Sequence, residues 1–151
     1  MVREFDALAW LQDHGFAGPT PLVALVWRRL GFVVRATLVT TAWPGTQADL
    51  VLAASAAPER NAVAESIGTL VGTLHALGFR DRNLDLRNLL VHGTPNGWVT
   101  AKIDSPRWQL RPAGRRDDAL VRADWARLSP QLAAYGVEAI ARAAALRVPA
   151  D

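Results

Sequence analysis

Asn88 and Asp104 carry the two kinds of side chain in this sequence that are best suited to hold magnesium. An amide oxygen and a carboxylate are hard oxygen ligands, and Mg²⁺ bound by one or two such groups keeps positions free for phosphate oxygens. Phosphoryl transfer needs this arrangement, because its catalysis depends mainly on positioning and on positive charge. Taken alone, each residue is better explained structurally, Asn88 as a turn cap and Asp104 as the end of a strand.

The residues around this pair follow the order of a kinase catalytic loop. In that order a helix leads into a loop where an Asp precedes an Asn by five residues, and a later Asp at the end of a strand binds the metal. Asn88 and Asp104 take the two metal positions, with apolar flanks at Leu89–Val91 and Ile103. The position of the proton-accepting Asp holds Asn83, whose amide cannot accept a proton from the substrate. This order favours phosphotransferase ancestry and predicts impaired catalysis.

Asp81 and Asp85 are the nearest carboxylates that could replace the missing base at Asn83. Loss of a general base costs about 10²–10⁴ in rate, so a substitute would matter. The spacing favours neither residue. Both are also explained as solvated groups or as ion-pair partners of the neighbouring arginines Arg80, Arg82 and Arg87, and the two interpretations stay open at this point.

The chain contains sixteen arginines but only one lysine, Lys102. Because Lys102 follows the catalytic loop, we predict that it is a solvated strand residue and that no lysine is available to grip nucleotide phosphates. No Gly-rich phosphate loop precedes the first predicted helix either. We therefore expect that the first strands of a kinase small lobe are lost, or that they are encoded upstream of Met1.

The elements that must position these residues are predicted to follow one another in an α+β order. Apolar residues at helical spacing predict helices over residues 3–14, 48–54, 58–77, 117–132 and 137–146. Two β-rich runs, 22–27 and 33–41, are expected to form an antiparallel hairpin with Gly31 in its turn.

Two further strands, 89–91 and 98–103, are predicted on either side of a turn at residues 92–97. A tight turn at residues 94–97 would fold the two strands together and bring Asn88 and Asp104 close to each other. Residues along the second strand alternate as in a half-buried strand, with Val99, Ala101 and Ile103 on the opposite face from Thr100, Lys102 and Asp104.

Composition narrows the functional classes. A chain of 151 residues, half of them apolar, fits one globular domain. The absence of cysteine excludes disulfides and thiolate sites, and the three scattered histidines offer no zinc spacing. The net charge of +3 comes from scattered arginines, which argues against nucleic-acid binding. Without a signal peptide or an 18-residue apolar run, we expect a cytoplasmic protein.

The sequence resembles the bacterial lipopolysaccharide kinases of the Kdo-kinase type, from residue 3 to about residue 132. The most specific similarities are to the family's Leu-His-x-x-Gly segment, its catalytic-loop tail and its Ile-Asp-x-x-Arg metal motif, which correspond to residues 74–79, 85–91 and 103–107. Residues 3–11 resemble the family's helix C, residues 35–40 its central hairpin strand, and residues 124–128 its closing helix.

This resemblance implies a protein-kinase-like fold that lacks the first strands of the small lobe and has a mostly helical C-terminal lobe. Residues 1–151 would form one truncated domain, with residues 1–45 as the small-lobe remnant and residues 46–151 as the C-terminal lobe. The implied activity is ATP- and Mg²⁺-dependent phosphorylation of a sugar hydroxyl of the lipopolysaccharide core.

The resemblance also implies roles for individual residues. Glu4 would be the helix C glutamate that braces a nucleotide lysine, and Asn88 and Asp104 would hold Mg²⁺. Asn83 stands at the position of the catalytic Asp, and residues 41–45 would form the hinge that meets adenine.

Two other functions remain open. One is a pseudokinase that keeps the fold as a binding or scaffolding module, and the other is a phosphotransferase of the aminoglycoside or choline type. The expected partners are a lipopolysaccharide sugar or another small acceptor, without nucleic acid, and at most peripheral contact with the inner face of the inner membrane. A protein partner or a second copy of the chain could pair with an open hairpin edge.

Overall fold

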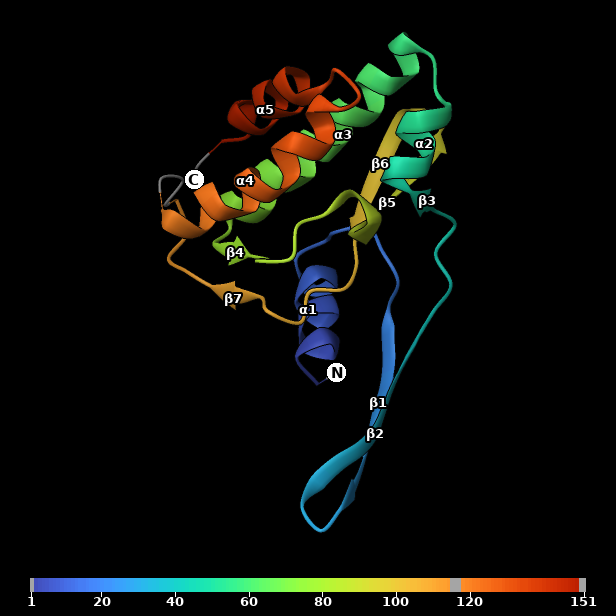
Figure 1. The fold of residues 1–151 in the computed structure, drawn as a ribbon, viewed down its shortest axis with the longest axis vertical. Helices are drawn as coiled ribbons and strands as arrows, with labels where there is room; N and C mark the ends of the chain where they lie inside the picture. The colour runs from blue at the N-terminus through green and yellow to red at the C-terminus, as the bar shows by residue number, and fades with distance from the viewer. Residues whose placement is uncertain (1, 115–117, 150–151) are drawn as a thin grey trace.

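The computed structural model describes residues 2–114 and 118–149. Helices α3, α4 and α5 pack together at one end of the molecule, and the hairpin of β1 and β2 projects from the other end, as Figure 1 shows. The helices are α1 (Val2–Asp13), α2 (Ala48–Ala54), α3 (Ala57–Ala76), the short 3₁₀ helix η1 (Leu86–Asn88), α4 (Ala119–Ala133) and α5 (Glu138–Arg147). The strands are β1 (Pro21–Arg29), β2 (Phe32–Thr40), β3 (Thr46–Gln47), β4 (Phe79–Arg80), β5 (Leu89–Thr94), β6 (Gly97–Lys102) and β7 (Gln109–Leu110).

The α+β class and the predicted helices are confirmed. The predicted helix 117–132 corresponds to α4, although Asp117 itself lies outside the described residues. The side chain of Asp118 caps α4 by accepting hydrogen bonds of 2.8 Å from the backbone amides of both Leu120 and Val121. This N-cap satisfies amides that have no partner within the helix.

Helix α3 is the centre of the hydrophobic core, and it packs closely against α5. A Cβ atom at Gly68 would lie only 2.1 Å from the carbonyl oxygen of Ala141, and one at Gly72 would lie 2.5 Å from that of Ala145. The two helices can therefore approach this closely only because α3 carries glycines along the contact. Apolar residues of α1, α2, α4 and β5 complete the same core.

Strands β5 and β6 form a hairpin with the tight turn at Thr94–Gly97 that the sequence predicts. The strands run from Leu89 to Thr94 and from Gly97 to Lys102, so only residues 95–96 connect them. Both strands therefore extend further toward the turn than the predicted bounds 89–91 and 98–103. The hydroxyl of Thr94 donates to the carbonyl oxygen of Gly97 at 2.8 Å and closes the turn.

The prediction that Lys102 is solvated was wrong, and Thr100 on the same face of the strand is buried as well. Thr100 is 6% exposed and Lys102 is 1% exposed, while Ala101 between them is fully buried. The hydroxyls of Thr100 and Ser66, the latter on α3, lie 2.7 Å apart within hydrogen-bonding distance. Strand β6 is thus covered on both faces at its C-terminal end, a situation that strand alternation alone does not reveal.

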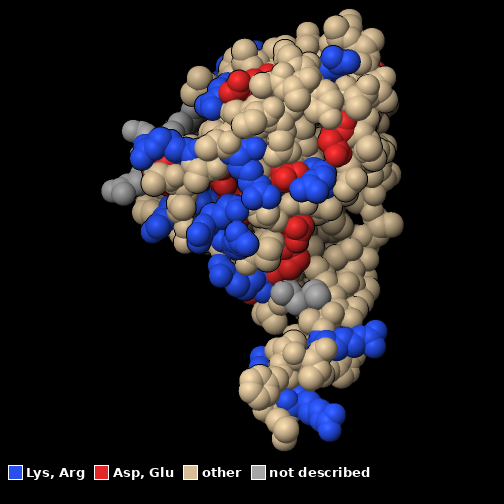
Figure 2. Space-filling model, viewed as in Figure 1, with Lys and Arg blue, Asp and Glu red and all other residues tan. Residues whose placement is uncertain are grey.

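The predicted antiparallel hairpin of β1 and β2 is present and forms a sheet of its own. Among the described residues these strands pair only with each other. The hairpin with its turn holds nine of the large hydrophobic side chains that are exposed: Leu22, Val23, Leu25, Trp27, Leu30, Phe32, Val33, Val34 and Val39. Residues 21–40 contain three arginines and no acidic residue, and Figure 2 shows only basic charge at this end of the molecule. That another protein or a second copy pairs with this edge stays a prediction.

Two short pairings were not predicted, because two-residue strands leave no periodic pattern. Strand β4 pairs with β7, which joins the segment entering the catalytic loop to the segment that follows Asp104. Strand β3 pairs with β5. Within the described residues, no helix has the length and apolar character needed to cross a membrane.

Candidate functional site

The pairing of β5 with β6 brings Asn88 and Asp104 to the same end of this hairpin. Leu89 lies opposite Lys102 in the antiparallel register, so Asn88 comes just before one strand and Asp104 follows soon after the other. The backbone amide of Ile103 donates to the carbonyl oxygen of Asn88 at 3.0 Å and extends the pairing beyond the strands. Two residues that are sixteen positions apart in the sequence are therefore neighbours in the fold.

Asn83 joins this pair through its side chain. Its Nδ2 donates to Oδ2 of Asp104 at 3.0 Å and to the carbonyl oxygen of Asp104 at 2.9 Å, while Nδ2 of Asn88 donates to the carbonyl oxygen of Asn83 at 3.2 Å. The three predicted residues thus form one hydrogen-bonded group. A carboxylate at position 83 would place two negative charges at this distance, whereas the neutral amide stabilises Asp104 without a cation.

Asp104 occupies an unusual backbone conformation, with φ of +56°. This left-handed region is costly for residues other than glycine, although Asp tolerates it better than most. The conformation persists when surrounding contacts hold it in place. Here the hydrogen bonds from Asn83 to both the carbonyl and the carboxylate supply part of that support.

Asp124 on α4 holds the loop that carries Asn83. Its carboxylate accepts hydrogen bonds from the backbone amides of Arg82, at 2.8 Å, and Asp81, at 3.3 Å. The Nε2 atom of His75, at the end of α3, lies 3.1 Å from the same carboxylate. Asp124 is 1% exposed, and Arg82 has a φ of +59°, so a buried carboxylate fixes a strained part of the loop.

Arg80 is fully buried and anchors the start of the loop. Its guanidinium donates to Oδ2 of Asp118 at 2.9 Å and to the carbonyl oxygens of His75 at 2.8 Å and Phe79 at 3.1 Å. A buried cation needs such partners, because its desolvation is otherwise very costly. The loop is therefore attached at once to the C-terminus of α3 and to the N-terminus of α4.

Asp81 pairs with Lys102. The Nζ atom of Lys102 lies 3.2 Å from Oδ2 of Asp81, and the side chains are 0% and 2% exposed. Burial raises the pKa of the Asp81 carboxyl, and the Lys102 charge and the Ser105 hydroxyl oppose that shift only in part. The prediction of a solvated Lys102 was wrong, because β6 is buried where it meets the loop.

Asp85 is occupied by other interactions. Its Oδ1 atom accepts from the backbone amide and from Nε of Arg87, both at 3.1 Å, and its Oδ2 atom lies 3.5 Å from Nη2 of Arg127. The Arg87 hydrogen bond, opposed by desolvation, holds the pKa of the Asp85 carboxyl below its ordinary value. The predicted pairing with Arg87 is present, and Asp85 also caps η1.

This ion pair leads to a prediction about pH. Because the pKa of Asp85 in the folded protein is lower than its ordinary value of 3.8, the ionised carboxylate stabilises the fold at pH values above 3.8. This stabilisation is lost as the pH falls through the pKa of the folded state. Asp85→Asn keeps a capping group, so at pH 7 we expect it to lose only about 1 kcal/mol of unfolding free energy. Urea unfolding at pH 7 and pH 3 measures the difference, which should shrink at the lower pH. A difference of equal size at both values would contradict the assignment.

Glu4 lies in the first turn of α1, against the segment that follows β6. Desolvation raises the pKa of its carboxyl, opposed by the Lys102 charge and by the backbone amide of Ser105. Arg3 and Trp108 fix this contact, since Nε1 of Trp108 donates to the carbonyl oxygen of Arg3 at 2.8 Å and the Arg3 guanidinium donates to that of Trp108. The charge of Lys102 on β6 therefore acts on Glu4, whereas the role of Glu4 in bracing a nucleotide lysine stays a prediction.

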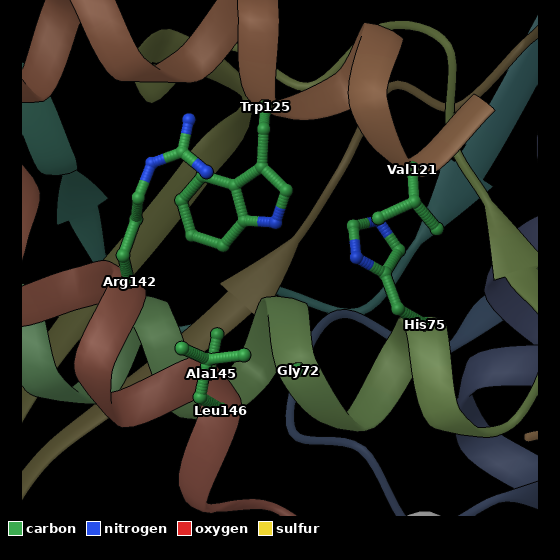
Figure 3. Close-up of a pocket in the computed structure, with 7 residues that line it drawn as sticks. All are labelled: Gly72, His75, Val121, Trp125, Arg142, Ala145 and Leu146. Atoms are coloured by element: carbon green, nitrogen blue, oxygen red, sulfur yellow. The ribbon is translucent and has the colours of Figure 1, made fainter. Parts of the chain in front are cut away.

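A small cavity lies behind the loop, between α3, α4 and α5. It has a volume of about 110 Å³ and is lined by Gly72, His75, Val121, Trp125, Arg142, Ala145 and Leu146, as Figure 3 shows. The guanidinium of Arg142 lies 4.8 Å from the ring centroid of Trp125. None of the lining residues is a predicted metal ligand or base, so this cavity is separate from the candidate site.

The donor set at the site fits a magnesium ion that is shared with a nucleotide. Among the described residues no three His, Cys, Asp or Glu side chains gather to hold a metal ion. The ligands available are one carboxylate, on Asp104, and one amide, on Asn88. Such a pair suits Mg²⁺, which commonly takes its remaining ligands from water and phosphate oxygens.

Sequence reasoning missed the residues that support the site. Arg80 and Lys102 look like surface residues in the sequence, since basic side chains are seldom fully buried. Asp118 could have been found, because an Asp just before an apolar helical pattern is an N-cap signal. No local signal marks Asp124 as the acceptor for loop amides, because its partners lie more than forty residues away.

Comparisons with known proteins agree with this geometry. The structure is similar to "WaaP in complex with acyl carrier protein", with a TM-score of 0.74 and 18% identity over 98% of this chain and 66% of that one. It is also similar to the Rio2 kinase–ADP/Mg²⁺–phosphoaspartate complex from Chaetomium thermophilum, with a TM-score of 0.66 and 14% identity over 99% of this chain and 45% of the other.

These two likenesses show a kinase-like fold, and this chain spans less than two thirds of the length of either structure. Among curated proteins, none matches the sequence. The model of the lipopolysaccharide kinase (Kdo/WaaP) family matches residues 1–129, which is most of the chain. The chain therefore belongs to the lipopolysaccharide kinase (Kdo/WaaP) family.

Proposed function

We propose that this chain binds Mg²⁺ and ATP at Asn88 and Asp104 and transfers a phosphoryl group to a sugar hydroxyl of the lipopolysaccharide core, with low turnover. One observation carries the proposal: the β5–β6 register and the Ile103–Asn88 hydrogen bond bring a carboxylate and an amide together at the end of the hairpin. Both donor types suit Mg²⁺ in phosphoryl transfer.

Membership of the family supports ATP and Mg²⁺ as the cofactors. The residues Asn88 and Asp104 support a binding site for them at the end of the β5–β6 hairpin. Asn88 and Asp104 would hold the metal, which would neutralise charge on the phosphates. Glu4 would brace the segment after Asp104 from the side of α1. Because the Asn83 amide cannot take the acceptor's proton, the chemical step would depend on positioning and on the metal alone.

The proposed phosphoryl acceptor and the proposed cellular location are both inferred from the family. A sugar hydroxyl of the lipopolysaccharide core is the acceptor that the family description supports. We propose that the chain works in the cytoplasm, in peripheral contact with the inner face of the inner membrane where such an acceptor would be reached.

The proposal predicts stabilisation by nucleotide only when metal is present. A ligand at 100 times its Kd adds about 2.7 kcal/mol to the unfolding free energy. For a domain of this size we expect Mg²⁺ with ATP to raise Tm by roughly 5–10 °C in a thermal melt. Asp104→Ala removes the carboxylate ligand and should abolish the shift, whereas Asp6→Ala, an exposed change on α1, should keep it. An equal shift in Asp104→Ala would place the nucleotide elsewhere.

A pseudokinase is the second candidate, and a specific observation favours it. The Asn83 amide is bonded to Asp104, Asp81 is paired with buried Lys102, and Asp85 is paired with arginines. No carboxylate among these three positions is therefore free to act as a base. If the wild-type chain binds Mg²⁺ and ATP but shows no turnover with any sugar acceptor, the pseudokinase function is the correct one.

A further inference from the structure

The chain's one lysine lies in a buried cluster of charges directly behind the candidate metal site. Lys102 is 1% exposed, and its Nζ atom lies 3.2 Å from Oδ2 of Asp81. The same atom donates to the carbonyl oxygen of Ile103 and, at 3.3 Å, to that of Asp104. The Lys102 charge also acts on the carboxylate of Glu4, which reaches the cluster from α1.

Stability alone does not account for this lysine. A buried ion pair commonly gives no more stability than apolar side chains of the same size, because both charges must be desolvated. The cluster also lacks some hydrogen bonds. Among the described residues, no well-formed hydrogen bond reaches the two carboxylate oxygens of Asp81 or the hydroxyl oxygen of Ser105. Because burying the Lys102 ammonium group is costly, we infer that it has a specific structural role.

The backbone conformation of the residues after Lys102 indicates this structural role. Asp104 has a φ of +56°, in the left-handed region, and its carbonyl oxygen accepts from both Nδ2 of Asn83 and Nζ of Lys102. The ammonium group also holds the preceding carbonyl, that of Ile103. Two successive peptide groups are thus fixed from the buried side, which determines the direction of the Asp104 side chain.

We propose that Lys102 is a positioning residue for the metal-binding carboxylate: its ammonium group fixes the carbonyls of Ile103 and Asp104 and balances the charges of Asp81 and Glu4. The lysine acts from β6, after the catalytic loop. The metal-binding part of this inference rests on the proposed function, whereas the backbone-positioning part does not.

The test uses a double variant that leaves the net charge of the cluster unchanged. Lys102→Met/Asp81→Asn removes one positive and one negative charge, so the electrostatic attraction for a cation stays nearly the same. Loss of the ammonium group should weaken the affinity for Mn²⁺ in the presence of ADP by about 10- to 100-fold, the usual effect of removing an outer-shell partner. Electron paramagnetic resonance of free Mn²⁺ measures this affinity.

Lys102→Met alone separates position from charge. It removes a positive charge near the metal, so an effect of charge alone would strengthen Mn²⁺ binding. Positioning predicts weaker binding instead. Tighter binding by this variant, or unchanged binding by the double variant, would overturn the proposal.

A readout without metal distinguishes this proposal from the proposed function. Hydrogen exchange of the Ile103 amide should become at least about 10-fold faster in the double variant, while exchange at Val91 and Thr100, paired within the hairpin, stays slow. If wild type binds no Mn²⁺ but this exchange change occurs, the metal function fails and the positioning role stands. Unchanged exchange contradicts the positioning role.

A second variant covers the case in which the double variant does not fold. Asp81→Asn alone keeps the ammonium group on both carbonyls, so the Ile103 amide should exchange as slowly as in wild type. Fast exchange in Asp81→Asn would show that the carboxylate, and not the lysine, fixes this segment, and it would overturn the proposal.

Discussion

Asn83→Asp is expected to raise the rate of ATP turnover by about 10²–10⁴, the usual contribution of a general base. The change restores a carboxylate at the loop position whose side-chain amide donates to Asp104 in the present structure. A steady-state assay of ADP release, with Mg²⁺ and a sugar acceptor, measures the effect. The new carboxylate also faces that of Asp104, so without Mg²⁺ the variant should be less stable than wild type by about 1 kcal/mol.

Two controls locate this effect. Asn96→Asp makes the same chemical change in the exposed turn at the far end of the β5–β6 hairpin and should leave turnover unchanged. Asn83→Asp combined with Asp104→Ala should lose the gain, because the metal ligand is missing. A gain that persists in this double variant, or no gain in Asn83→Asp despite bound Mg²⁺ and ATP, would show that position 83 is not the base position.

Asp124→Ala is expected to lower the unfolding free energy by about 3–5 kcal/mol, because each buried donor that loses its acceptor costs about 1–3 kcal/mol. The substitution leaves the amides of Asp81 and Arg82 without their acceptor and removes the partner of His75. A loss of this size is a large fraction of the stability of an ordinary domain, commonly 5–15 kcal/mol. Urea unfolding followed by circular dichroism measures it.

Two further variants test whether the stability contributed by Asp124 comes from accepting the loop amides of Asp81 and Arg82. Asp124→Asn keeps one oxygen acceptor and should lose clearly less stability than Asp124→Ala. Asp6→Ala, an exposed Asp→Ala change on α1, should lose no more than about 0.5 kcal/mol. A loss from Asp124→Ala as small as that from Asp6→Ala would contradict its role as the anchor of the loop.

Local patterns predicted the long elements and the meeting of Asn88 with Asp104. Helix α3 has a regular apolar face and the β5–β6 hairpin has a turn signal at its end, so both follow from short-range sequence. Once that hairpin is assumed, the register brings its two flanking residues together. The spacing to Asn83 then identifies the third residue of the group.

The supporting contacts could not be predicted, because they depend on how separate elements pack. Alternation along a strand predicts one solvent-facing side, whereas β6 is covered on both sides near its end, and Lys102 is buried there. Strands β4 and β7 are two residues long and form only because tertiary contacts bring residues 79–80 beside residues 109–110.

Calorimetric titration of ADP, with and without Mg²⁺, into wild type and Asp104→Asn tests the central claim most directly. Asn at position 104 keeps the size of the side chain and removes the charge that Mg²⁺ requires there. The account predicts binding to wild type that is at least about 10-fold tighter with Mg²⁺ than without it, and no gain from Mg²⁺ in the variant. Equal binding of ADP with and without Mg²⁺ in wild type, or the same gain in both proteins, would contradict it.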